Sequence, residues 1–180
     1  MSQRIRRFRA ADRDAMLAFA QDLPDHDLMF LGRDLKHPRV VEAWLQAIDD
    51  GWLDSLLAED GETILGSVAL VRDPLGWSAH VGEVRLLVSA ERRGAGLGRD
   101  LLQAIMAIAV ERGLAKLTAA MTPDQRNSVA LFESLGFRGE ALLRDQLRDR
   151  AGQPHDLAIL SLDLGRQQAT QRAYGFDANG

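Results

Sequence analysis

The feature that most constrains this chain is a run of glycines and arginines between two apolar segments. The run is Arg92-Arg93-Gly94-Ala95-Gly96-Leu97-Gly98-Arg99; it follows a strand-like segment over residues 82–88 and opens a helix-like segment. A glycine-dense turn exposes backbone N–H groups, and the dipole of the following helix adds roughly half a positive charge behind them. Such a turn binds phosphate without a lysine. The sequence therefore predicts a phosphorylated ligand, with Arg93 and Arg99 adding charged contacts at its rim.

Two familiar phosphate-binding turns do not fit these letters. A P-loop ends in Gly-Lys-Ser/Thr, whereas an arginine follows the last glycine here, Gly98. A Rossmann fingerprint needs glycine at its first, third and sixth positions, and neither Gly94 nor Gly96 starts such a pattern. The pattern that remains is Arg93-x-x-Gly96-x-Gly98 after a strand.

This pattern resembles the signature of the GNAT superfamily of acetyl-CoA-dependent N-acetyltransferases, Arg/Gln-x-x-Gly-x-Gly/Ala after a strand of the form Leu-x-Val-x-Pro. Leu86 and Val88 match that strand, and Ala90 stands where proline is usual. A second segment, Leu131-Phe132-Glu133-Ser134-Leu135-Gly136-Phe137, is similar to the family's Leu-Tyr-Glu-Lys-Leu-Gly-Phe. The two motifs together, in the family's order, carry the resemblance.

The resemblance covers residues 3–163 and implies the GNAT-like acyl-CoA N-acyltransferase fold. This is an α/β (α+β) fold with a mixed, mostly antiparallel central sheet and helices on both faces. The sheet is expected to splay open between the strands that end at Val88 and Ala120, with acetyl-CoA in the opening. The residues implied to bind this cosubstrate are Leu86, Leu87, Val88, Arg93, Gly94, Ala95, Gly96, Leu97, Gly98, Arg99, Asn127 and Phe132.

The resemblance also implies how the acetyl group is activated. The backbone N–H of Val88 or a neighbour is expected to face the thioester oxygen, an oxyanion-hole arrangement worth ~3 kcal/mol per donor. A carboxylate near the central strand often removes the proton of the amine, and Glu83 is the candidate here; an ordinary solvated glutamate would look the same. His80 and the neighbours His155 and Asp156 are lesser candidates.

Two positions depart from the family's pattern. Phe132 stands where many relatives have a tyrosine that protonates departing coenzyme A. Because a thiol has a pKa near ~8.5, its thiolate leaves without help, and loss of the acid need not abolish activity. The asparagine that often bonds the pantetheine arm is replaced by Gln125, while Asn127 lies two residues later. Either side chain could serve, and either could instead begin a helix.

Composition bounds the class of protein. With 180 residues, the chain suits one domain, predicted over residues 1–164 and followed by a C-terminal tail over 165–180. A net charge of −4 gives no reason to expect nucleic acid as a partner. The chain has no cysteine, and no metal is expected. No apolar run approaches the ~20 residues of a membrane span, and no signal core follows the N-terminus, so a cytoplasmic protein with no membrane partner is expected.

Hydrophobic spacing predicts the order of the elements. Strands are predicted over residues 3–9, 52–58, 63–71, 82–88, 114–120, 137–148 and 155–162, and helices over 12–22, 38–50, 97–112 and 125–135. Glu59-Asp60-Gly61 and Ala151-Gly152 mark two hairpin turns. Residues 23–37 are predicted to be a polar connection with apolar anchors.

The acceptor is the least constrained part of the prediction. The resemblance implies a groove built from residues 22–37, 74–79 and 143–156. Asp25, Asp27 and Asp34 make its first segment acidic, which favours a cationic amine, although a solvated loop would carry the same charges. The expected partner is a primary amine on a small molecule or a protein N-terminus, and a homodimer is one assembly left open.

The leading prediction is therefore an N-acetyltransferase in which the amine attacks acetyl-CoA directly in a ternary complex. A second reading, from another class of protein, is a non-catalytic acetyl-CoA-binding or sensor module that engages a protein partner; Phe132 and the unsettled base keep it open. A third is transfer of a longer acyl group on the same scaffold.

Overall fold

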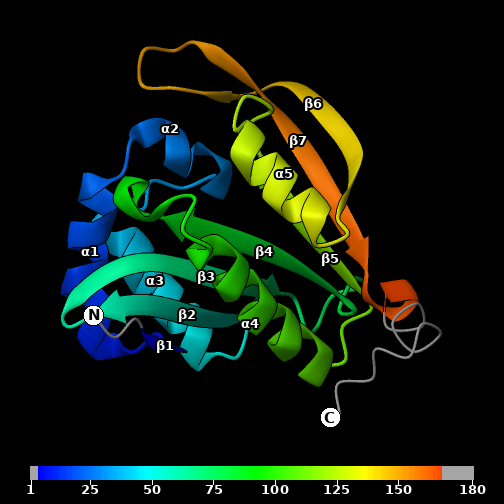
Figure 1. Cartoon of the computed structure of the whole chain (residues 1–180), viewed down its shortest axis with the longest axis horizontal. Helices are drawn as coiled ribbons and strands as arrows, with labels where there is room; N and C mark the ends of the chain where they lie inside the picture. The colour runs from blue at the N-terminus through cyan, green and yellow to red at the C-terminus, as the bar shows by residue number, and fades with distance from the viewer. Residues whose placement is uncertain (1–3, 168–180) are drawn as a thin grey trace.

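The computed structural model describes residues 4–167, and within them seven strands form one sheet in the order β1-β2-β3-β4-β5-β7-β6 (Figure 1). The strands are β1 (Arg4–Arg7), β2 (Leu53–Asp60), β3 (Thr63–Arg72), β4 (Val81–Val88), β5 (Lys116–Met121), β6 (Arg138–Arg148) and β7 (Pro154–Asp163). The helices are α1 (Arg13–Asp22), α2 (Asp25–Leu28), α3 (Pro38–Asp49), α4 (Leu97–Glu111) and α5 (Arg126–Ser134), and the 3-10 turns are η1 (Ala10–Asp12), η2 (Met29–Leu31) and η3 (Ala90–Arg92).

The sheet is mixed and mostly antiparallel, as predicted. Among the strand pairs of residues 4–167, β4 and β5 are parallel and the other neighbours are antiparallel. A parallel pair needs a crossover, and α4 supplies it between β4 and β5. The two predicted hairpins, β2–β3 and β6–β7, are confirmed.

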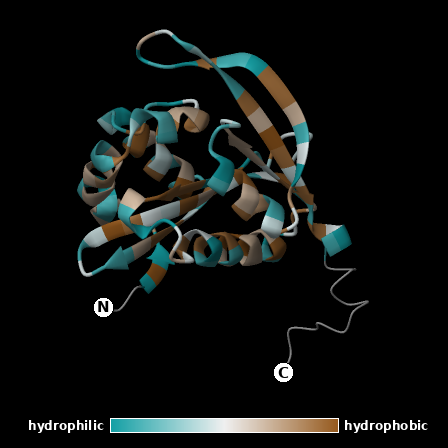
Figure 2. Cartoon of the chain, turned by 45° about the horizontal axis from the view of Figure 1, so that its top comes forward, coloured by the Kyte–Doolittle hydropathy of each residue, from teal (hydrophilic) through white to brown (hydrophobic). Residues whose placement is uncertain are grey.

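Helices cover both faces of this sheet, which confirms the predicted layering. One buried cluster packs α1 and α3 against one face, and a second packs α4 and α5 against the other. Side chains of β4 alternate between the two, since Val84 belongs to the α4 cluster and Leu87 to the α1–α3 cluster. A slip of one residue would exchange these sets, so burial fixes the register of β4. Figure 2 shows hydrophobic residues on the strands between the helix layers.

α4 forms because its apolar residues recur at helical spacing. The residues of α4 that are buried on the sheet are Leu97, Leu101, Leu102, Ile105, Ile108 and Ala109. Gly113, with φ of +72°, follows the end of the helix, as predicted. The backbone N–H of Leu114 still donates to Ala109 at 3.0 Å, so β5 begins at Lys116, two residues later than predicted.

Two segments near the N-terminus differ from the predicted elements. A helix was predicted to begin at Asp12, but the Asp12 carboxylate accepts from the Arg6 guanidinium at 2.7 Å and the Arg9 N–H at 2.8 Å. That turn is η1, and α1 begins at Arg13. The predicted connection over residues 23–37 contains the short helix α2, because Leu28 and Leu31 are buried beside α1 and α3.

The predicted boundary between domain and tail falls in a helical turn over residues 164–167. Leu164 is 2% exposed in the α4 cluster, and Gln167 donates to the carbonyl of Leu135 at 3.2 Å. The rest of the predicted tail lies outside the described residues. Within residues 4–167, no helix has both the length and the hydropathy to cross a bilayer.

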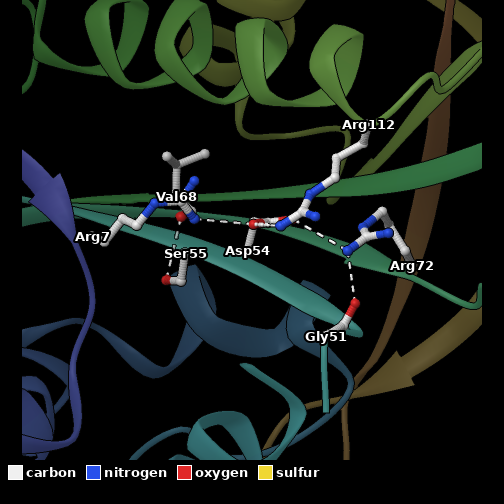
Figure 3. A network of polar contacts seen from close by, with 7 residues as sticks. All are labelled: Arg7, Gly51, Asp54, Ser55, Val68, Arg72 and Arg112. Carbon is white, nitrogen blue, oxygen red and sulfur yellow. Dashed lines mark hydrogen bonds and ion pairs between the residues drawn. The ribbon is translucent and has the colours of Figure 1, made fainter. Parts of the chain in front are cut away.

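Asp54, at the start of β2, is a buried carboxylate that contacts three arginines (Figure 3). Its side chain is 4% exposed and lies 3.1 Å from Arg7, 3.4 Å from Arg72 and 2.8 Å from Arg112. Arg72 also donates to the carbonyl of Gly51 at 2.7 Å. Burial raises the pKa of Asp54, but hydrogen bonds from Arg112 and Arg7 outweigh burial, so the pKa lies below its ordinary value. The network joins three strands to the end of α4.

Candidate active site

The sheet opens between β4 and β5, as the resemblance implied. These strands pair over three positions, from Val81 with Lys116 to Glu83 with Thr118, and no pairing follows. A cleft of about 600 Å³ occupies the opening. The predicted binding residues that line it are Leu86, Leu87, Val88, Arg93, Gly94, Gly96, Gly98, Arg99, Asn127 and Phe132. Ala95 is exposed within the same turn, and Leu97 is buried in the core.

The glycine turn ends with backbone N–H groups at the start of α4. Gly94 and Gly96 have φ of +76° and +88°, a left-handed conformation that glycine adopts without strain. The N–H of Asp100 donates to Gly96 at 3.1 Å. The N–H groups of Leu97, Gly98 and Arg99 precede it, in the first turn of the helix, where the helix offers no acceptor. This end of the cleft is therefore suited to an anion.

Gly98 has a different role from the other two glycines. A Cβ atom placed on Gly98 would lie 3.0 Å from the Cδ2 atom of Leu131 and 3.5 Å from the Cδ2 atom of Leu86. At Gly94 and Gly96, by contrast, a Cβ would meet no atom within 4 Å. Gly98 thus allows α4 to pack closely against β4 and α5, whereas the other two shape the turn.

The two arginines of the motif already have protein partners. Arg93 donates from Nη2 to the Asp27 carboxylate at 2.5 Å and from both Nε and Nη2 to the carbonyl of Val88 at 3.2 Å. Arg99 donates to the hydroxyl of Ser134 at 2.8 Å. Both side chains line the cleft, so the prediction that they contact the ligand at its rim remains a prediction.

The backbone of Val88 points into the cleft. Ser89 donates its N–H to the carbonyl of Leu65 in β3 at 2.9 Å. Backbone groups of successive strand residues point to opposite sides, so the N–H and C=O of Val88 point away from β3 and toward β5. The two bonds that Arg93 makes to the Val88 carbonyl lie on that side. Because β5 no longer pairs here, the Val88 N–H faces the cleft.

The candidate bases lie outside the cleft lining. Glu83 is at the last paired position of β4, and its Oε1 is 2.9 Å from Arg85 Nε in an ion pair. His80 precedes β4, so roughly 25 Å of extended strand separates it from Val88. His155 bonds Asp149 at 3.0 Å rather than its neighbour, and Asp156 accepts from the backbone N–H of Asp145. The expected pair of His155 and Asp156 does not form.

Phe132 and the two amides lie where the motif places them. The ring of Phe132 is 3% exposed, lines the cleft and meets the Phe137 ring edge-on at 5.0 Å. Asn127 and Gln125 both line the cleft, and Gln125 donates to Asp27 at 3.4 Å. Gln125 is at the N-cap position of α5 but makes no side-chain capping bond. The Asn127 amide, by contrast, bonds no other side chain within residues 4–167.

α2 lies across the mouth of the cleft, which the sequence did not indicate. His26 Nε2 is 2.9 Å from Asp124 Oδ2 and 3.2 Å from Thr122 Oγ1, at the end of β5. Asp27 contacts Arg93 of the glycine turn and Gln125 of the α5 N-terminus. Two adjacent residues of α2 therefore contact both walls of the cleft: His26 contacts the end of β5, and Asp27 contacts the glycine turn. The sequence shows only a histidine in an acidic connection.

The acidic acceptor segment is largely neutralised within the protein. Asp25 pairs with Lys36 at 2.9 Å and Arg150 at 2.5 Å, and Arg150 also pairs with Asp34 at 2.8 Å. The β6–β7 hairpin extends over α2 in Figure 1, and Arg150 at its tip makes these contacts. The three aspartates of this segment therefore already have cationic partners within the protein. Residues 74–79 do not line the cleft, and the fully exposed Trp77 belongs to the turn before β4.

Sequence comparison agrees with this geometry. A family model described as "Acetyltransferase (GNAT) family" matches residues 18–137. L-2,4-diaminobutyric acid acetyltransferase of Methylotuvimicrobium alcaliphilum is 30% identical over 128 residues, which is 65% of this chain and 69% of that protein. Mycothiol acetyltransferase of Kocuria rhizophila is 34% identical over 122 residues, or 67% of this chain and 39% of that protein. N-acetyltransferase 8F1 of Rattus norvegicus is 26% identical over 101 residues, covering 55% and 44%. The chain spans less than half of the last two relatives.

Solved structures share the fold. An N-acetyltransferase from Staphylococcus aureus Mu50 superposes with a TM-score of 0.79 at 20% identity, covering 91% of this chain and 99% of the other. The protein yncA from Salmonella typhimurium, solved with its cofactor acetyl-CoA, has a TM-score of 0.75 at 22% identity, covering 91% and 95%.

Proposed function

The chain belongs to the GNAT acetyltransferase family, and on that premise we propose that it transfers an acetyl group from acetyl-CoA to a primary amine. The amine, carried by a small molecule or a protein N-terminus, attacks the thioester directly in a ternary complex. The observation that carries the proposal is the cleft, which joins the glycine turn at one end to the open strand edge of Val88 at the other.

The residues of the cleft fit acetyl-CoA. The N–H groups at the start of α4, which have no acceptor within the helix, and the open space above Gly94 and Gly96 suit its pyrophosphate. Between β4 and β5 the unpaired backbone of residues 84–88 offers donors and acceptors for the pantetheine amides. Phe132 and Leu131 give that arm an apolar wall. Phosphate, amide and apolar parts of the molecule thus each meet a matching surface.

The acetyl group would lie at the Val88 N–H. Negative charge develops on the thioester oxygen as nitrogen attacks carbon, and a fixed N–H aimed at it lowers the barrier by ~3 kcal/mol. The donor comes from the backbone, so no particular side chain is required at position 88. The departing thiolate needs no acid because its conjugate thiol has a pKa near ~8.5, which is compatible with phenylalanine at position 132.

The proposal is tested by thiol release from acetyl-CoA in the presence of an amine panel. The panel comprises a diamine, an amino acid with a side-chain amine, and a peptide with a free N-terminus. We expect steady thiol release with at least one of them and a product whose mass is higher by one acetyl group. Binding of acetyl-CoA without turnover on any amine would instead favour the non-catalytic sensor module.

The prediction that Glu83 is the general base can be tested separately. If Glu83 accepts the proton of the amine, Glu83→Gln should lower kcat/KM by about 100-fold near neutral pH, because general base catalysis contributes roughly that much. The measurement is the pH dependence of kcat/KM between pH 6 and 9.5. A profile identical to that of the wild-type protein would show that Glu83, bound to Arg85, serves only the ion pair.

A further inference from the structure

His26 holds a position that neither the motif nor the family match assigns. It belongs to α2, and its ring contacts Thr122 and Asp124 across 96 and 98 positions of sequence, directly after β5. The adjacent residue, Asp27, reaches Arg93, which bonds the carbonyl of Val88 at the end of β4. Successive Cα atoms lie ~3.8 Å apart, so His26 is held over the gap between the ends of the two splayed strands.

The contacts fix which nitrogen of His26 carries the proton. Burial raises the pKa of Asp124, but the hydrogen bond from Thr122 and the proximity of His26 outweigh it, so the pKa lies below its ordinary value. The ionised carboxylate can only accept, and its Oδ2 is 2.9 Å from Nε2. Neutral His26 is therefore protonated on Nε2. The Nδ1 lone pair has no hydrogen-bond donor within residues 4–167.

We propose that Nδ1 of His26 takes the proton from the acceptor ammonium, with Asp124 and Thr122 as the residues that position it. This rests on the proposed acetyl transfer and names its proton acceptor. A base held by a carboxylate on one nitrogen and open on the other is the arrangement that activates nucleophiles in many unrelated enzymes. The side chain of His26 is 34% exposed, so an amine in solution can reach it.

Proton, bond and leaving group balance in this step. One proton moves from R–NH3⁺ to Nδ1, leaving R–NH2 with its lone pair. That nitrogen bonds to the carbonyl carbon, the carbon–sulfur bond breaks, and the nitrogen's surplus proton ends on the thiolate. The products are the N-acetyl amine, coenzyme A as a thiol and an imidazolium that returns its proton to water. Imidazole suits this work because its ordinary titration range includes neutral pH.

The charges that face His26 come from three elements. Asp124 contacts it from the β5–α5 connection, and the ring of His155, itself bonded to Asp149 at 3.0 Å, meets it edge-on at 5.4 Å from the β6–β7 hairpin. On α2 its neighbours Asp25 and Asp27 are both engaged by cations. Asp124 is thus the carboxylate that bonds the His26 ring.

Glu83 is the competing proton acceptor, and geometry favours His26. Glu83 lies at the paired end of β4, and Arg85 engages its carboxylate. His26 lies at the open end, bonded to the cleft residue Asp124. The Nδ1 lone pair is available, whereas both Glu83 oxygens accept from Arg85, at 2.9 and 3.3 Å.

The test compares the full chain carrying His26→Gln with wild type and with His80→Gln as a matched control. Glutamine keeps an N–H donor for Asp124 but has no base. We expect kcat/KM for the amine to fall about 100-fold at pH 7, and the pH profile of kcat/KM to differ from that of the wild-type chain. His80→Gln, before β4 and remote from the cleft, should retain both rate and profile. Calorimetry should give unchanged acetyl-CoA affinity for His26→Gln.

Two further measurements distinguish a catalytic role of His26 from a purely structural contact between α2 and β5. Imidazole added to His26→Ala should restore part of the rate, because a free base can replace a missing one but cannot rebuild a contact between α2 and β5. Long-range ¹H–¹⁵N NMR of the unliganded protein should show His26 protonated on Nε2, and Asp124→Asn should change that tautomer population.

The outcomes separate this inference from the proposed function. If wild type turns over but His26→Gln keeps its rate within threefold and keeps the wild-type pH profile, the assignment of His26 is overturned while acetyl transfer stands. Absence of imidazole rescue, or an Nδ1–H tautomer, also overturns it. If wild type binds acetyl-CoA and acetylates no amine, both proposals fall.

Discussion

Gly96→Val is expected to raise the Kd for acetyl-CoA at least ~100-fold, since losing two charge-assisted hydrogen bonds at ~1.5–3 kcal/mol each is sufficient. Gly96 has φ of +88°, which a β-branched residue adopts only with strain of about 1–3 kcal/mol. The turn relieves that strain by changing shape, and the N–H groups before α4 then no longer converge on the pyrophosphate. Isothermal titration calorimetry with acetyl-CoA measures the change.

A matched variant separates the cofactor effect from simple destabilisation. Gly61, in the β2–β3 hairpin, has φ of +63°, and a Cβ atom there, as at Gly96, would meet no atom within 4 Å. Gly61→Val should therefore lose comparable free energy of unfolding while the Kd for acetyl-CoA stays unchanged. Equal affinity in both variants would contradict the assignment of the glycine turn as the pyrophosphate site.

Asp54→Asn is expected to lower the free energy of unfolding at pH 7 by about 3 kcal/mol, near the lower end of values for breaking a buried ion pair. The lower end applies because Arg7 and Arg112 are about half exposed, at 58% and 45%, and can turn to water. Arg72, only 11% exposed, would lose its carboxylate partner. Denaturation in urea measures the difference. Asp22→Asn, at an exposed position in α1, is the control and should change stability by less than ~0.5 kcal/mol.

The lowered pKa of Asp54 predicts how the free energy of unfolding changes with pH. The pKa of Asp54 is lower in the folded chain than its ordinary value of ~3.9. A lowered folded-state pKa means that the stabilisation is fully present above the ordinary value and is lost as the pH falls through the folded-state value. The gap between wild type and Asp54→Asn should therefore be constant from pH 7 to about 5 and shrink below ~4. A gap that stays constant down to pH 2.5 would contradict this account.

Local sequence was sufficient for the glycine turn and for the helix that follows it. Positive φ at Gly94 and Gly96 is a property of glycine itself, and the buried face of α4 follows from 3.6-residue spacing within one segment. The mixed sheet and its opening between β4 and β5 came from family resemblance, because spacing within a strand does not say which strand pairs beside it.

Local sequence did not predict which polar side chains bond to one another. His26 meets Thr122 across 96 residues, Arg93 meets Asp27 across 66, and Asp54 meets Arg112 across 58. The sequence around each of these residues does not indicate its partner, because many other exposed aspartates and arginines in the chain could pair with it equally well. The expected pair of His155 and Asp156 failed for a related reason: neighbours on a strand point to opposite faces, and the turn brought Asp149 to the histidine instead.

The sequence by itself thus determined the position of the glycine turn that we propose as the phosphate site, because the turn depends on the backbone freedom of glycine and the start of one helix. Only the tertiary structure decided which side chains close the cleft and where a free imidazole nitrogen lies. Those features depend on α2, the end of β5 and the β6–β7 hairpin meeting in space, and that meeting is fixed by burial of the two apolar clusters on the sheet.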